Sequence, residues 1–112
     1  MSRKSSLGEF EQMVLLAVLQ LEDEAFGPGI SKLLEDRAGR EVSRGALYSS
    51  LDRLERKGFL RWSIASPGAD RSGYRKRRFQ VTGPGLQALK DARQAMEALY
   101  RGLDHVFERG SR

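Results

Sequence analysis

The sequence predicts an α+β domain that is mostly α-helical, in which three helices precede a β-hairpin and one long helix follows it. Apolar residues recur at helical spacing in four segments, and in two short segments they alternate with polar residues. Turns that contain glycine and proline separate these segments. With 112 residues, the chain is long enough for one compact core and too short for two.

The first expected helix is apolar on every side. Its helical stripe consists of Leu7, Phe10, Val14, Ala17 and Leu21, and every residue from 13 to 19 is apolar. A helix that is apolar all round is usually buried all round. In so small a domain we expect it to pack on its own core with one face and on a second subunit with another. A central helix in a monomer is the alternative.

A short turn separates the second helix from the third. Gly39 is the expected C-cap of the second helix, residues 41–42 are expected to form a very short strand, and Ser43 is expected to cap the third helix. The third helix should bury a leucine stripe formed by Leu47, Leu51 and Leu54. On its outward face, Asp52 and Arg56 are spaced for an ion pair.

Two strands and a last helix complete the pattern. Residues 59–66 and about 74–81 read as strands around a turn-rich loop, with Trp62 as a core or half-buried strand residue. Thr82 is the expected cap of a single helix over about 84–108, which is long for a domain of this size. Such a helix has more apolar length than one small core can cover, so we expect it to pack on a partner.

This order of elements is a winged helix-turn-helix with a long C-terminal dimerisation helix. We expect residues 1–82 to form the winged helix-turn-helix, as a DNA-binding domain. Residues 83–112 should form the dimerisation helix, packed on the same core.

Positive charge is concentrated in the middle of the chain. The formal net charge is +5, but residues 43–82 hold ten basic and three acidic side chains, a balance of +7. Such a block is the electrostatic footprint of a polyanion partner. A solvated surface that only aids solubility is the alternative.

The candidate DNA contacts lie on the third helix and the hairpin. The first residues of that helix meet base edges in such modules, and Arg44 could read guanine through a bidentate contact. Tyr48 and Ser49 are expected at phosphates. In the hairpin, five basic residues fall within eight positions that contain no acid. The full set of expected DNA-binding residues is Lys32, Ser43, Arg44, Gly45, Tyr48, Ser49, Arg53, Arg71, Arg75, Lys76, Arg77 and Arg78.

The expected homodimer interface draws on the first and last helices. Its residues recur at helical spacing and are apolar, namely Phe10, Val14, Leu86, Leu89, Met96, Leu99, Leu103 and Val106.

Other classes of function have little support in the sequence. There is no cysteine, no cluster with metal-ligand spacing, no pair of nucleophile and base, and no phosphate-binding glycine loop, so we expect no catalysis, metal or cofactor. The apolar run at residues 13–19 is too short to span a bilayer. A cytoplasmic protein without a membrane partner is expected. The alternative function is that of a winged-helix module that binds proteins and has no specific DNA binding.

Residues 43–60 carry the most specific family pattern. They are similar to the recognition helix of the PadR family of bacterial transcription regulators, with Ser-x-Gly-x-Leu-Tyr, then Leu-x-x-Leu-Glu, then Gly. Residues 79–85 resemble the wing exit of that family, and residues 8–12 resemble one of its short forms. Two positions depart from the pattern, because Phe26 replaces a tyrosine and Arg78 replaces an aromatic residue.

The resemblance implies a dimer that binds a pseudo-palindromic operator on double-stranded DNA, usually as a repressor. It also implies a small aromatic or drug-like effector near the dimer interface. No pocket residue can be matched for that effector.

Overall fold

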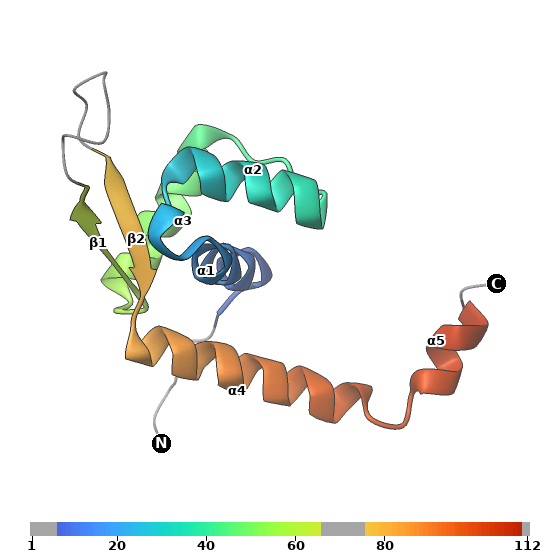
Figure 1. The fold of residues 1–112 in the computed structure, drawn as a ribbon. Helices are drawn as coiled ribbons and strands as arrows, with labels where there is room; N and C mark the ends of the chain where they lie inside the picture. Colours follow the sequence, from blue (N-terminus) through green and yellow to red (C-terminus); the bar gives the residue numbers. More distant parts are fainter. Residues whose placement is uncertain (1–6, 66–75, 111–112) are drawn as a thin grey trace.

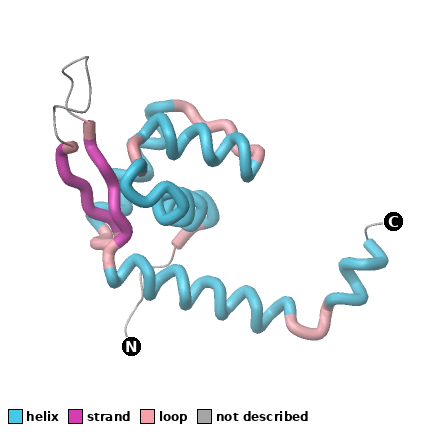
Figure 2. Tube along the Cα trace, in the orientation of Figure 1, coloured by secondary structure: helices cyan, strands magenta, loops and turns pink. Residues whose placement is uncertain are grey.

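The computed structural model describes residues 7–65 and 76–110. Three helices form the body, an antiparallel hairpin lies beside them, and a long helix leads away from the hairpin (Figure 1, Figure 2). The predicted, mostly helical winged helix-turn-helix is confirmed. In chain order the elements are α1 (Glu9–Leu21), the 3-10 turn η1 (Glu22–Glu24), α2 (Gly27–Ala38), α3 (Arg44–Arg56), β1 (Leu60–Ile64), β2 (Arg77–Val81), α4 (Gly83–Tyr100) and α5 (Asp104–Gly110).

Helices α1, α2 and α3 enclose one hydrophobic core. The predicted leucine stripe of α3 is buried, since Leu47, Leu51 and Leu54 are each at most 2% exposed. Residues from every neighbouring element pack around this stripe, among them Val14, Leu15, Ile30, Leu34, Leu60 and Phe79. One face of α3 is therefore fixed in the core, and its other face is left to the surface.

The helix ends follow the predicted caps. The side chain of Ser43 accepts a hydrogen bond from the backbone N–H of Ala46 at 3.1 Å, and Thr82 accepts one from Gly85 at 3.1 Å. Gly39 ends α2 in the left-handed conformation. These bonds satisfy backbone groups that would have no partner at a helix end, so each helix starts or stops at a defined residue.

Strand β2 has a neighbour on each edge, β1 on one and residues 25–26 on the other. Strands β1 and β2 pair with Trp62 opposite Phe79. The other edge of β2 meets residues 25–26, where the N–H of Phe79 donates to the carbonyl of Ala25 at 2.9 Å. The very short strand predicted at residues 41–42 is wrong. These residues form no strand, and the second edge of β2 is occupied by residues 25–26. The prediction of a core or half-buried Trp62 is wrong, because its side chain is exposed, at 37%.

The residue that caps α4 is hydrogen-bonded to the turn that follows α3. The hydroxyl of Thr82 donates to the carbonyl of Gly58 at 2.6 Å, and the N–H of Thr82 donates to the carbonyl of Phe59 at 3.1 Å. Gly85 is buried directly against this turn, and a Cβ there would collide with the carbonyl oxygen of Phe59 and lie 2.8 Å from Cγ1 of Val81. Only glycine lets the backbone of α4 approach so closely.

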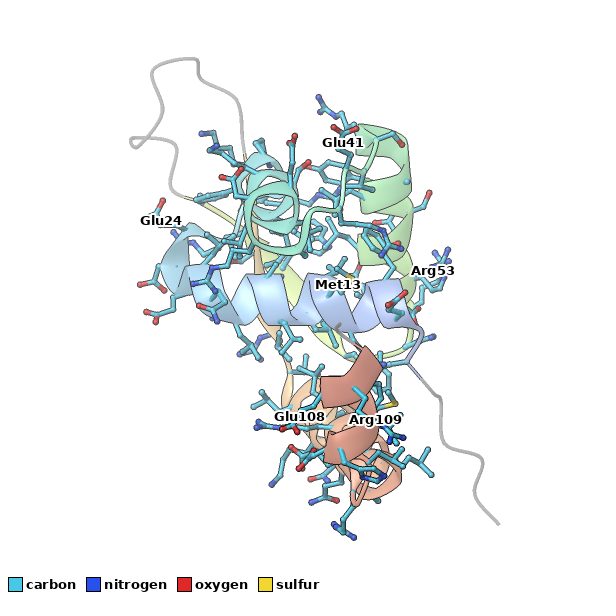
Figure 3. All side chains as sticks on the ribbon, turned by 90° about the vertical axis from the view of Figure 1, so that its right-hand side faces the viewer. Met13, Glu24, Glu41, Arg53, Glu108 and Arg109 are labelled. Carbon is cyan, nitrogen blue, oxygen red and sulfur yellow. The ribbon has the colours of Figure 1, made fainter. Side chains whose placement is uncertain are left out.

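The predicted single helix over 84–108 is wrong, because it breaks at Gly102. This glycine has a φ of 85°, which a helix cannot include, and α5 starts in a new direction after it (Figure 1). The rings of Tyr100 and Phe107 lie 5.4 Å apart across the break. From residue 93 to residue 109 every described side chain is exposed, so this arm stands away from the core. Figure 3 shows Glu108 and Arg109 on α5, apart from α1 and α3.

None of the helices in the described part of the chain is long and apolar enough to cross a membrane.

Replacing Gly85 with alanine should destabilise the fold, because the new methyl group overpacks the contact with Phe59. We expect Gly85→Ala to lower the free energy of unfolding by about 1–3 kcal/mol in chemical denaturation at fixed protein concentration. Gly83→Ala is the matched control, since a Cβ at Gly83 meets nothing within 4 Å. Equal stability of the two variants would contradict the close approach.

Candidate nucleic-acid interface

The first turn of α3 presents a small and positively charged surface. Arg44, Gly45 and Ser49 are exposed there, and among the described residues Arg44 makes no ion pair. The side chain of Ser43 is engaged in the cap, so it fixes the start of the helix. Small side chains next to a guanidinium that has no ionic partner among the described residues suit close approach to the edge of a base pair.

Tyr48 joins α3 to α2. It is half-buried, and its ring lies between two guanidinium groups, with Arg44 at 5.7 Å and Arg77 at 5.4 Å from the ring centre. Its hydroxyl is packed so closely on Gly27 that a Cβ there would collide with it. Gly27 is a residue that the sequence reasoning missed, and its position before Pro28 was the available signal.

An open cleft of about 1180 Å³ lies between the start of α2, the start of α3 and the start of β2. It contains three positively charged side chains and no acidic one, and its lining consists of Phe26, Gly27, Pro28, Gly29, Arg44, Gly45, Tyr48, Lys76 and Arg77. Five of the predicted DNA contacts therefore meet in one concavity. A cleft of one charge sign attracts an anion such as the phosphate backbone of DNA.

The hairpin cations divide between two faces. The ammonium of Lys76 lies 5.6 Å and the guanidinium of Arg78 5.8 Å from the ring centre of Phe26. Nε of Arg78 is buried and makes no hydrogen bond. Arg77 points to the other face, toward α3. Arg71 and Arg75 lie outside the described residues.

Asp52 pairs with the hairpin and not with its own helix. One carboxylate oxygen of Asp52 lies 3.7 Å from Nη1 of Arg77. The predicted pair of Asp52 with Arg56 is wrong for the described part of the chain, because the carboxylate is directed to β2.

Glu11 holds the far end of α3. Its side chain is 8% exposed, and both of its oxygens lie 2.9 Å from Nζ of Lys57, while Arg53 is 3.8 Å away. The N–H of Gly8 also donates to it at 2.9 Å. Figure 3 shows Arg53 beside the end of α1 that carries Glu11. Arg53 was predicted at DNA, and the structure places it in this cluster. The sequence reasoning missed Glu11.

Burial by itself would raise the pKa of Glu11, but the charged and hydrogen-bonding neighbours outweigh it. The hydrogen bond from Gly8 and the contact with Lys57 are the larger contributions, and Arg53 adds to them. The pKa of Glu11 is therefore lowered, and its charged form stabilises the contact between α1 and α3.

Lys32 lies apart from the cleft. It is exposed on α2 and bonds Asp36 one turn further along at 3.0 Å, which raises the pKa of Lys32. An exposed pair of this kind contributes little to stability.

The predicted dimer residues fall into two groups. Leu86, Met96, Leu99, Leu103 and Val106 are exposed on α4 and α5. Phe10 and Leu89 pack partly on the core of the protomer, and Val14 is completely buried in it, so the side chain of Val14 offers no surface to a second copy. Four further apolar residues are exposed on α1, α4 and α5, namely Leu16, Leu19, Tyr100 and Phe107.

A second, mostly apolar groove of about 590 Å³ runs between the start of α1 and α4. Its apolar lining includes Leu7, Phe59, Ala88, Ala92 and Met96. The described residues contain no group of three or more histidine or acidic side chains placed to hold a metal.

The family model of the PadR-like transcriptional regulators matches residues 15–91. The chain belongs to this family. The match covers the second half of α1 through the first half of α4, and so includes α3, the hairpin and the close contact at Gly85. No curated protein matches the chain in sequence.

Solved structures of PadR-like proteins share the fold. A PadR-like transcriptional regulator from Bacillus cereus has a TM-score of 0.70 at 19% identity, over 88% of this chain and 90% of that one. A PadR-like transcription factor from Bacteroides fragilis has a TM-score of 0.68 at 23% identity, over 87% and 88%. A PadR family regulator from Eggerthella lenta has a TM-score of 0.64 at 26% identity, over 89% and 87%.

Replacing Glu11 with glutamine should remove a pH-dependent contribution to stability. Because the pKa of Glu11 is lowered in the folded protein, its contribution is complete above the ordinary carboxyl pKa and is lost as the pH falls through the folded pKa. We expect Glu11→Gln to lower the free energy of unfolding by about 1–2 kcal/mol at pH 7, and the difference to shrink as the pH falls below the ordinary carboxyl pKa.

Glu9→Gln is the control, because Glu9 is exposed two residues earlier on α1. It should change stability by less than about 0.5 kcal/mol. Denaturant titrations across the pH range measure both variants. A Glu11→Gln effect that stays constant with pH would show that its charge is not what matters.

Proposed function

We propose that this PadR-like regulator is a cytoplasmic homodimer that binds a pseudo-palindromic operator on double-stranded DNA and acts as a repressor. One observation carries the DNA-binding part of this proposal. The start of α3 exposes Arg44, Gly45 and Ser49 at the edge of a positively charged cleft, while the opposite face of the same helix is buried. A helix that is fixed on one side and basic on the other is suited to the major groove.

In this proposal each part of the interface has its own task. Arg44 reads a base edge, since its guanidinium can make two parallel hydrogen bonds to guanine. The cleft beside it, with Lys76 just before β2, receives the phosphate backbone. Residues 1–82 bind DNA, and residues 83–112 join the two copies.

The homodimer is supported by apolar surface that the protomer leaves uncovered. Leu16 and Leu19 are 50% and 40% exposed on α1, and Leu99 is 75% exposed on α4. Contiguous exposed apolar patches on small proteins mark interaction sites. Two copies joined through α1, α4 and α5 would carry two recognition helices, as a palindromic site of half-sites about 34 Å apart requires.

An aromatic or drug-like effector is proposed for the groove between α1 and α4. Its volume of about 590 Å³ and its apolar lining suit a small organic molecule. The repressor role and the effector both follow the family resemblance.

Fluorescence anisotropy with a duplex from the gene's own upstream region and a scrambled duplex tests the DNA-binding proposal. At about 150 mM salt we expect the specific complex to be about a thousandfold tighter than the scrambled one. Arg44→Ala should weaken the specific complex by about 1–3 kcal/mol and reduce this preference. Arg37→Ala, at an exposed arginine near the end of α2, is the matched control. Equal and weak binding to both duplexes would favour a protein-binding module instead.

Replacing Leu99 and Leu103 with aspartate should give monomers, because two charges would be buried in the apolar interface. Light scattering measures the mass, and circular dichroism checks that the helices persist. A pair of exposed polar residues on the same helix, Gln94 and Glu97, provides the control variant Gln94→Asp with Glu97→Asp. A dimer that survives the leucine changes would place the interface elsewhere.

A further inference from the structure

We infer that Arg77 is a positioning residue, which together with Asp52 ties the hairpin to the recognition helix and so sets sequence preference. This inference rests on the proposed DNA-binding function. It gives Arg77 a different task from the phosphate contact that the basic run of the hairpin suggests.

The position of Arg77 on β2 directs it toward α3. Alternate residues of a strand share one face, so Arg77 lies on the same face as Phe79, which is 1% exposed in the core. Its guanidinium carbon lies 5.6 Å from the ring centre of Phe79 and 5.0 Å from that of Trp62. The side chain of Arg77 is only 32% exposed.

Arg77 contacts two successive turns of α3. Asp52 lies 3.7 Å from its Nη1, and the ring of Tyr48 lies 5.4 Å from its guanidinium carbon. Arg44, Tyr48 and Asp52 are spaced four residues apart and so follow one side of the helix. A continuous set of contacts therefore leads from the hairpin, through Arg77 and Tyr48, to the base-reading Arg44.

The chemistry of arginine suits this task. A guanidinium is planar and weakly hydrated, so it can stack on aromatic rings while it bonds a carboxylate, which a lysine ammonium does less well. With three rings around it and Asp52 as its ionic partner, Arg77 has fewer groups left for a phosphate than Arg44 has. The angle between hairpin and α3 then decides which base pairs both can reach at once.

The phosphate role and the positioning role predict opposite effects for Asp52→Asn. If Arg77 were a phosphate contact restrained by Asp52, loss of that negative charge would tighten binding to every duplex. If the pair positions the hairpin, the specific complex weakens although a charge that repels DNA has been removed. We expect about tenfold weaker specific binding and unchanged or tighter binding to the scrambled duplex.

Glu55→Gln is the matched control for charge. It removes one negative charge from the same helix at an exposed side chain, and we expect it to leave the ratio of specific to scrambled binding unchanged. Arg77→Ala and Arg77→Lys should lower that ratio as Asp52→Asn does. They should leave the log–log salt slope of the specific complex within about 0.3 of the wild type, whereas a lost phosphate contact lowers it by about 0.9.

Trp62 gives a readout that does not depend on DNA, because it is the only tryptophan of the chain and lies beside Arg77. Asp52→Asn should raise the acrylamide quenching of Trp62 fluorescence in the free protein, and Glu55→Gln should not. Unchanged quenching in Asp52→Asn, tighter binding to both duplexes, or a slope lowered by about 0.9 in Arg77→Ala would each overturn the inference. A wild type without preference for its own duplex, but with the expected quenching, would overturn the proposed function alone.

Discussion

The close approach of α4 to the turn after α3 is the constraint on which the rest of the molecule depends. At Gly85 the backbone of α4 packs against the carbonyl of Phe59, and Thr82 bonds Gly58 and Phe59 at the same place. The helix that leads to the apolar arm and the helix that carries the basic surface therefore meet at one rigid joint. Any movement of one relative to the other must pass through these few backbone contacts.

Helix α3 is held in three different ways, and each has a different physical character. Its leucine stripe is fixed by burial, which is strong and non-directional. At its far end, Glu11 adds a nearly buried ion pair with Lys57, which has direction and depends on pH. At its near end, Tyr48 packs on Gly27 and is flanked by arginines. The buried stripe fixes which face of α3 points inward, and the other two contacts hold its two ends.

Periodicity and capping predicted most of the fold, because both are local properties of the chain. The leucine stripe, the caps at Ser43, Gly39 and Thr82, and the hairpin all depend on residues a few positions apart. Contacts between residues far apart in the sequence could not be predicted in this way. Asp52 could have paired with Arg56 four residues away or with Arg77 on β2, and the local spacing indicated only the first, which does not form in the described part of the chain. The basic character of the site could be read from composition, but the cleft that gathers its residues depends on how α2, α3 and β2 meet.

If the proposed effector binds the apolar groove, the contact between Gly85 and Phe59 offers a route by which it would influence α3. Phe59 lines that groove, and its carbonyl is the group against which Gly85 packs. Leu7 on the opposite wall precedes Gly8, whose N–H bonds Glu11 at the far end of α3. A molecule in the groove would therefore lie next to both contacts that hold α3, the one at its end and the one with α4. Such a ligand changes DNA affinity only if it binds one arrangement of these contacts more tightly than another, because a ligand without that difference shifts no equilibrium. Close packing at Gly85 makes such a difference in affinity possible, because α4 can take few intermediate positions while its backbone packs against the carbonyl of Phe59.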